Sequence, residues 1–152
     1  MLQRIQTIYL LLASICVFLM YAFSFAKIDV VTSEYIFSFK GLEVDGKNIV
    51  DIPFAIIIGL LAVYTLATIF LFKNRPAQLK MGRLNYLLHL VLVVTLFFSA
   101  DAAMEKLPNG SAAIISYGVG FYLPVAAIAF LFLANRAIKA DEKLVKSLER
   151  LR

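Results

Sequence analysis

Four long, almost charge-free apolar runs constrain the fold of this chain more than any other feature. They cover residues 5–26, 52–72, 84–104 and 112–134, and Asp101 is the one charged residue within them. A helix needs roughly 20 apolar residues to cross a hydrocarbon core of about 30 Å, and backbone groups in lipid must form their hydrogen bonds internally. We therefore predict an all-α membrane protein, a single domain built as a four-transmembrane-helix bundle.

Basic residues predict the orientation of the bundle. Eleven of the fifteen Lys and Arg residues precede the first run, separate the second from the third, or follow the fourth. Seven of the ten acidic residues lie on the other side, six of them in the other two loops and Asp101 near the end of the third run. Basic loops stay in the cytoplasm, so we expect a multi-pass protein of the bacterial inner membrane with both termini cytoplasmic. The net charge of +5 is then explained by contact with lipid, and nucleic acid is not an expected partner.

The first run has a competing interpretation as a cleavable signal peptide. Arg4 precedes it, and the small residues Ser24 and Ala26 stand near its end. Its apolar part is longer than a signal core, so we expect a retained helix. Cys16 follows the bulky Ile15, which argues against a lipoprotein site, and a single cysteine excludes an internal disulfide.

The outer loop, residues 27–51, carries the period-two pattern of a strand. Tyr35, Phe37 and Phe39 alternate with other residues, and Asp45-Gly46 suits a tight turn. We predict a small extracytoplasmic β-hairpin loop of two or three short strands. Its aromatic residues either cover the outer ends of the helices, which we favour, or leave a strand edge for a partner.

The tail, residues 135–152, has apolar residues at three- and four-residue steps and predicts a C-terminal amphipathic helix. Such a helix can lie on an anionic membrane surface or bind a cytoplasmic partner. We favour the membrane surface.

His89 and Asn85 are the polar pair within the third run, one helical turn apart. One interpretation is a proton or quinone site. The other, which we favour, is a hydrogen bond between helices, with Gln6 or Thr7 as its partner.

Asp101 and Glu105 are candidate outer carboxylates on one face of the third run. Paired carboxylates can bind a cation or relay protons, but at the outer interface water or Lys106 would satisfy them. Acidic groups at a helix C-terminus oppose its dipole, so their presence has no evident structural benefit.

The fourth run shows small residues at four-residue steps, which let another helix approach closely. Proline at the last of these steps should kink the helix, and Ala55 with Gly59 offers a matching small face on the second run. The candidate helix-packing groove consists of Ala112, Ser116, Gly120 and Pro124.

Several segments resemble a family of small four-span inner-membrane proteins from Bacteroidota that is labelled as a domain of unknown function. The resemblance implies topology and location but no activity. Its residues gather at the cytoplasmic ends of the helices, which makes that face a candidate interaction surface: Arg4, Arg83, Asn85, His89, Asn135, Arg136, Asp141 and Lys143. The segments that carry the resemblance are residues 1–12, 83–85, 120–124, 133–138, 141–145 and 150–152.

No nucleophile–base set, phosphate loop or metal-ligand spacing is present in the sequence, so we predict no enzyme, no catalytic residue, no cofactor and no metal site. Our first hypothesis is a non-enzymatic accessory or scaffold subunit of a larger membrane complex. Its expected partners are the lipid bilayer and either another membrane protein or further copies of the chain. The alternative is a small transporter or a lipid- or quinone-binding protein that uses His89, Asn85, Tyr122 and Pro124.

Overall fold

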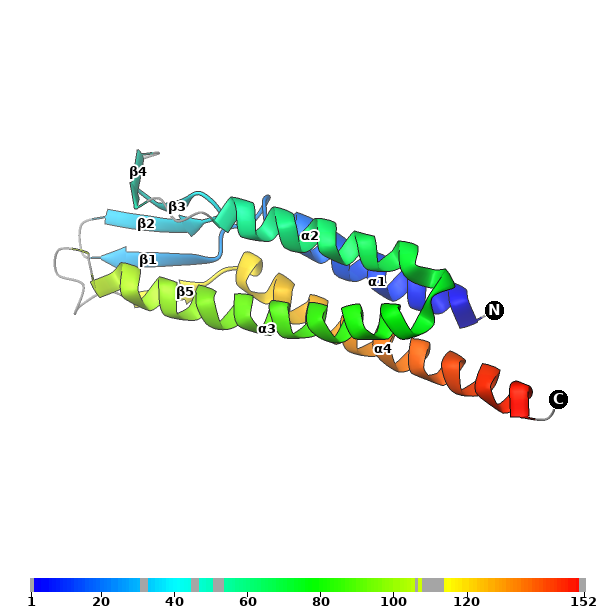
Figure 1. The fold of residues 1–152 in the computed structure, drawn as a ribbon. Helices are drawn as coiled ribbons and strands as arrows, with labels where there is room; N and C mark the ends of the chain where they lie inside the picture. The colour runs from blue at the N-terminus through cyan, green and yellow to red at the C-terminus, as the bar shows by residue number, and fades with distance from the viewer. Residues whose placement is uncertain are drawn as a thin grey trace.

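Four helices run side by side along one axis, and strands gather at one end of them (Figure 1). The structure is a computed structural model that describes residues 2–30, 33–44, 47–50, 54–105, 107 and 114–150. Both chain ends lie at the end of the bundle opposite the strands. The helices are α1 (Leu2–Leu19), α2 (Phe54–Phe70), the short 3-10 helix η1 (Leu71–Lys73), α3 (Arg75–Glu105) and α4 (Val119–Arg150).

The strands form one antiparallel sheet with the order β4-β3-β2-β1-β5. Ser38 pairs with Gly41 across the β2–β3 turn, and Gly41 has a φ of 113°, which favours glycine. The strand β5 comes from the far side of the sequence, and its Tyr117 pairs with Ala26 of β1. The strands are β1 (Ala26–Val30), β2 (Ser33–Ser38), β3 (Gly41–Val44), β4 (Lys47–Val50) and β5 (Ile114–Tyr117).

This architecture corrects the prediction of an all-α, four-span bundle. The chain combines helices with a five-stranded sheet. Within the described residues, two helices are long and apolar enough to cross a membrane, Arg75–Glu105 and Val119–Leu144, judged by length and composition. Ile5–Leu19 and Phe54–Phe70 are shorter apolar helices, so the four-span prediction is wrong.

Two predicted helices are shorter because the sheet takes their outer ends. After Leu19 the chain tightens into turns, in which the Ala22 amide donates to the Leu19 carbonyl at 2.9 Å. The Phe25 amide then donates to the Phe37 carbonyl at 2.7 Å, which directs the chain into β1. The predicted helix 112–134 loses residues 114–117 to β5 in the same way, because β-branched and aromatic residues there fit a strand.

At the basic end of the bundle, α3 and α4 are longer than the predicted helices 84–104 and 112–134. Asn74 accepts a hydrogen bond from the Ala77 amide at 3.3 Å, as an N-cap does. Pro76 lies in the first turn, where proline is tolerated, so the residues between the second and the third apolar run are mostly helix. The tail is also no separate helix, because α4 continues through Asn135 and Arg136 and projects past its neighbours (Figure 1).

Three phenylalanines join the sheet to the helices. Phe25, Phe37 and Phe54 are fully buried, and their rings meet edge to face with centroids 5.6 to 6.1 Å apart. Strands were predicted within residues 27–51, and β2 does place aromatic residues against the helix ends. The turn expected at Asp45-Gly46 lies outside the described residues.

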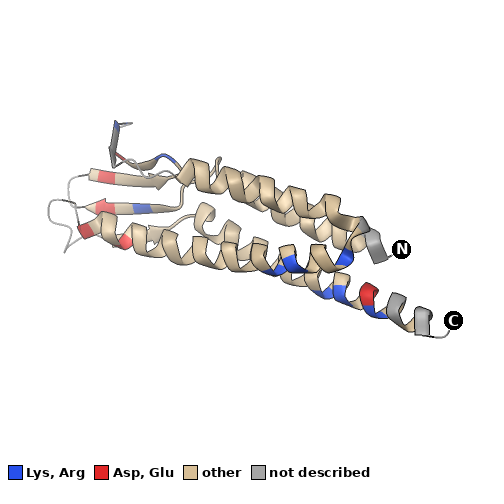
Figure 2. Ribbon diagram, viewed as in Figure 1, with Lys and Arg blue, Asp and Glu red and all other residues tan. Residues whose placement is uncertain are grey.

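Charges divide the molecule into two ends and a middle (Figure 2). Lys and Arg gather at the end that carries the termini, and most acidic residues lie at the sheet end. The helices between them carry no charge and expose large apolar side chains, such as Leu60 at 67% and Phe98 at 64%. An exposed apolar surface of this kind marks contact with a membrane or a protein.

Candidate functional site

Buried polar side chains occupy the interior between the helices, most of them in the half toward the basic end. Thr65 of α2 donates to the Asn85 Oδ1 of α3 at 3.1 Å, and Gln78 Nε2 donates to the Thr68 carbonyl at 3.2 Å. These bonds tie α2 to the first half of α3. The buried polar residues are Gln6, Ser14, Thr65, Thr68, Gln78, Asn85 and His89.

Asn85 and His89 are both fully buried, and their partners differ from the predicted ones. Asn85 meets Thr65, while His89 Nδ1 lies 2.9 Å from the Asn85 carbonyl. That contact requires Nδ1 to carry the proton, because a carbonyl only accepts. Within the described residues, Asn85 Nδ2 and His89 Nε2 have no hydrogen-bond partner.

This interior suits helix packing better than acid–base chemistry. The buried polar set contains no Asp, Glu, Lys or Arg among the described residues, so the His89 ring has no charged partner there. No group of three His, Cys, Asp or Glu side chains in the described chain could hold a metal ion.

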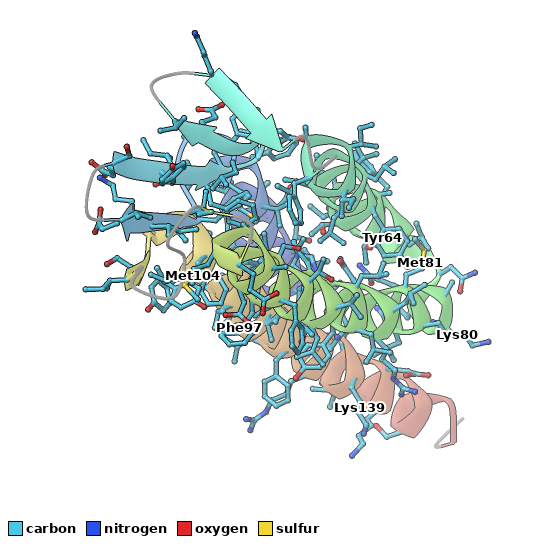
Figure 3. All side chains as sticks on the ribbon, turned by 90° about the vertical axis from the view of Figure 1, so that its left-hand side faces the viewer. Tyr64, Lys80, Met81, Phe97, Met104 and Lys139 are labelled. Carbon is cyan, nitrogen blue, oxygen red and sulfur yellow. The ribbon has the colours of Figure 1, made fainter. Side chains whose placement is uncertain are left out.

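An apolar groove runs between α2 and α3. Its volume is about 460 Å³, and its lining includes Leu60, Tyr64, Val91 and Thr95. Both polar groups in this lining bond to backbone: Tyr64 Oη donates to the Met81 carbonyl at 3.3 Å (Figure 3), and Thr95 Oγ1 to the Val91 carbonyl at 2.8 Å. The groove therefore offers almost no free polar group to an occupant.

A second groove, between α3 and α4, lies at the basic end. It consists of two adjoining hollows of about 290 and 350 Å³, both lined by Arg83, Phe132 and Asn135. Asn135 lies against Gly82 of α3, where a Cβ atom would collide with its side chain. This position lets the two helices approach closely.

The buried polar interior, the α2–α3 groove and the α3–α4 groove are built by residues from α1 to α4. Residues 2–151 match the family described as Domain of unknown function (DUF4293). The chain belongs to this family. No curated protein matches it.

The predicted small-residue groove does not form in this DUF4293 chain. Ser116 lies in β5, Ala112 lies outside the described residues, and Gly120 and Pro124 lie in α4. Gly120 instead packs against the turn after α1, since a Cβ atom there would lie 2.6 Å from the Ser24 carbonyl oxygen. The small face expected on α2 receives Tyr21, whose Oη donates to the Ala55 carbonyl at 2.5 Å.

The residues of the transporter or quinone hypothesis are not all brought together. His89 and Asn85 are buried, whereas Tyr122 of α4 is 58% exposed. Pro124 lies inside α4 and is buried. Tyr122 therefore does not line the interior that holds the other polar groups.

The candidate outer carboxylates, Asp101 and Glu105, are both exposed at the sheet end of α3. Burial raises the pKa of Tyr117 in β5, and the charge of Asp101 raises it further. Asp101 thus lies close enough to Tyr117 to disfavour its ionised form. The expected partner Lys106 lies outside the described residues.

The predicted cytoplasmic-face residues lie at the basic end. Asp141 forms an ion pair with Arg75, with Nη2 and Oδ2 3.2 Å apart. Arg83 and Arg136 are exposed beside the α3–α4 groove, and Lys143 is exposed further along α4. Arg4 lies in α1, and its side chain is outside the described part.

The apolar runs of the sequence do not identify Arg75 and Gln78, because both residues lie between the second and the third run. Asn74 followed by Pro76 is a helix-start signal, and reading it as such would have put both residues on α3. Gly82, in the same segment, serves the close approach of α4.

Proposed function

We propose that this protein is an integral membrane protein of the bacterial inner membrane whose basic end, with both termini, faces the cytoplasm. The support is the charge-free band between the two charged ends (Figure 2). In α3 this band covers residues 84–100, about 25 Å at about 1.5 Å per residue, which is close to a hydrocarbon core. Bacteroidota are the expected source, on the resemblance described above.

Cysteine labelling tests this orientation. In a Cys16→Ser background, Asp29→Cys reports on the sheet end and Lys143→Cys on the basic end, and both positions are exposed. In intact spheroplasts a membrane-impermeant maleimide should label Asp29→Cys, and it should label Lys143→Cys only after the cells are broken. The reverse pattern would exclude the proposed orientation.

We further propose that the protein is a non-enzymatic accessory or scaffold subunit, which binds an apolar transmembrane helix of a partner in the α2–α3 groove. The groove itself is the observation that supports this most. It is open on one side and apolar, and the polar groups of Tyr64 and Thr95 already bond to backbone. An apolar helix can fill such a groove without leaving a polar group unpaired, and helices in lipid associate through packing of this kind.

Site-specific photocrosslinking in cells tests this scaffold role. A benzoylphenylalanine at Leu60 or Val91 lies in the groove, and one at Val125 of α4 is a control that is exposed but lies outside it. We expect a discrete adduct from both groove positions and none from Val125. An adduct of twice the chain mass would identify a second copy as the occupant, whereas equal labelling at all three positions would refute a groove-specific partner.

The alternative function is a small transporter or a lipid- or quinone-binding protein. The apolar lining favours a lipid chain or quinone over a polar solute, so the transporter has less support. Lipid extraction and mass spectrometry of the purified chain separates the two proposals. A stoichiometric quinone that is lost on Leu60→Trp would favour ligand binding over a helix partner.

A further inference from the structure

Cations line the α3–α4 groove at the basic end, and apolar side chains line it one helical turn closer to the middle of the bundle. Arg83 of α3, with Arg136 and Lys139 of α4, lines the hollow nearer the chain termini. Tyr86, Leu87 and Phe132 line the adjoining hollow nearer the middle of the bundle. The step from Arg83 to Leu87 is one turn, about 6 Å along the axis.

We infer that this groove binds an anionic glycerophospholipid, with its phosphate between Arg83 and Arg136 and an acyl chain along Phe132. The inference rests on the proposed membrane location but not on the proposed scaffold role. Charge is the first argument for it. None of the ion pairs among the described residues includes any of these three cations, and the carboxylate of Asp141 is paired with Arg75. Guanidinium groups match a phosphate geometrically.

The order of charge and apolar surface along the groove is the second argument. Both helices place cations toward the end of the bundle and apolar groups toward its charge-free middle, as a phospholipid does with its headgroup and chains. Leu87 and Phe132 are 53% and 58% exposed, so the groove is continuous with the apolar outer surface. A soluble phosphate would use the cations alone and would leave this apolar part empty.

Native mass spectrometry of the full chain in detergent tests the inference, with phosphatidylglycerol, phosphatidylcholine and the soluble glycerol phosphate as probes. We expect phosphatidylglycerol to bind more tightly than phosphatidylcholine, and glycerol phosphate not to displace it. In the Arg83→Gln/Arg136→Gln variant the preference for phosphatidylglycerol should fall about 10- to 30-fold, as expected for the loss of two interfacial cations.

The control is Lys80→Gln/Lys143→Gln, which removes the same charge from the same end of the bundle but outside the groove. Figure 3 shows Lys80 reaching away from α3, while the groove residue Lys139 extends from α4. The control should keep the preference. Phe132→Ala should weaken lipid binding and leave the affinity for glycerol phosphate unchanged.

Three results would overturn the inference. They are an equal loss of the preference for phosphatidylglycerol in both double variants, full displacement of phosphatidylglycerol by glycerol phosphate, or a crosslink from Phe132 to a protein in place of a lipid. Circular dichroism and thermal unfolding of each variant establish that it is folded. A chain that stays in the membrane fraction but shows no preference for phosphatidylglycerol refutes this site alone. A chain that is absent from the membrane fraction refutes the proposed location.

Discussion

Two glycines show how close the segments of this molecule approach one another. A Cβ atom at Gly82 would collide with the side-chain amide of Asn135, which can turn away. At Gly120 it would lie 2.6 and 2.7 Å from the carbonyl oxygens of Ser24 and Phe23, and these belong to backbone. The same change from glycine to alanine therefore has different consequences at the two positions.

We predict that Gly120→Ala destabilises the protein more than Gly82→Ala does. Overpacking costs about 1–3 kcal/mol, and Gly120→Ala should lie at the upper end because backbone must shift. In the double variant Gly82→Ala/Asn135→Ala the shorter side chain at position 135 leaves room for the new Cβ atom. This variant should therefore recover most of the stability lost in Gly82→Ala. Thermal unfolding in detergent measures both effects, and a double variant no better than Gly82→Ala alone would contradict this explanation.

The buried histidine offers a second test at the scale of single residues. His89 Nε2 has no partner among the described residues, so a leucine removes a buried unpaired atom and, with it, the single bond from Nδ1 to the Asn85 carbonyl, and these two effects on stability oppose each other. We predict that His89→Leu changes the free energy of unfolding by less than about 1 kcal/mol. Phe37→Ala, which empties a fully buried site, should cost about 3–5 kcal/mol.

Urea unfolding of the two variants in mild detergent gives this comparison. A loss at His89→Leu as large as that at Phe37→Ala would show that the imidazole has a bonded role that its packing does not explain. The burial of Asn85 and His89 could be predicted from their position in an apolar run. The bond from Thr65 to Asn85 could not, because pairing depends on how α2 and α3 align.

At the scale of elements, the start of α3 is held by the far end of α4. Arg75 begins α3, and a cation at a helix N-terminus opposes the dipole. Asp141 of α4 compensates by bringing a carboxylate to that end, and both side chains are largely buried, at 24% and 14% exposure. A carboxylate at this end is expected to interact favourably with the helix dipole as well as with Arg75.

This arrangement predicts an asymmetry between the two partners. Asp141→Asn leaves an uncompensated cation at the positive end of α3 and should cost about 1–3 kcal/mol, between an exposed and a buried pair. Arg75→Gln removes the unfavourable cation and should cost less. Hydrogen exchange in the first turn of α3 and the last turns of α4 reports the effect. Equal losses in the two variants would rule out the dipole contribution.

The helix–strand boundaries show which parts of the secondary structure the apolar pattern can predict and which it cannot. The apolar runs predict helices where α1 to α4 lie, but they also predict helix for residues 114–117 and for the end of the first run, which are not helical. A short apolar run does not distinguish a buried strand from a helix by periodicity. What decides is the partner: β5 becomes a strand because β1 pairs with it, and no local pattern reports a pairing between such distant segments.

For the whole molecule, the proposed membrane location makes the thickness of the charge-free band a prediction about the preferred bilayer. Residues 84–100 of α3 lie between Arg83 and Asp101. They correspond to about 25 Å, less than the average core of about 30 Å, and mismatch costs a fraction of a kcal/mol per Å.

We therefore expect the thermal stability in nanodiscs to be highest with short-chain lipids and to fall as the acyl chains lengthen. Lipids of one headgroup and increasing chain length isolate the effect of thickness. A maximum in the thickest bilayers would contradict the assignment of the band to the hydrocarbon core. As a control, Glu34→Gln at the sheet end should leave the position of the maximum unchanged, because Glu34 lies outside the band.

The pairing of β1 with β5 also determines the order in which the protein can be completed during synthesis. The first four strands emerge from the ribosome early, but β1 keeps one unpaired edge until residues 114–117 are made. An open strand edge invites wrong pairing. The Gly118 amide finally donates to the Phe25 carbonyl at 2.8 Å, directly beside the start of α4. A nascent chain that stops after α3 would thus display an unfinished sheet to cellular quality control.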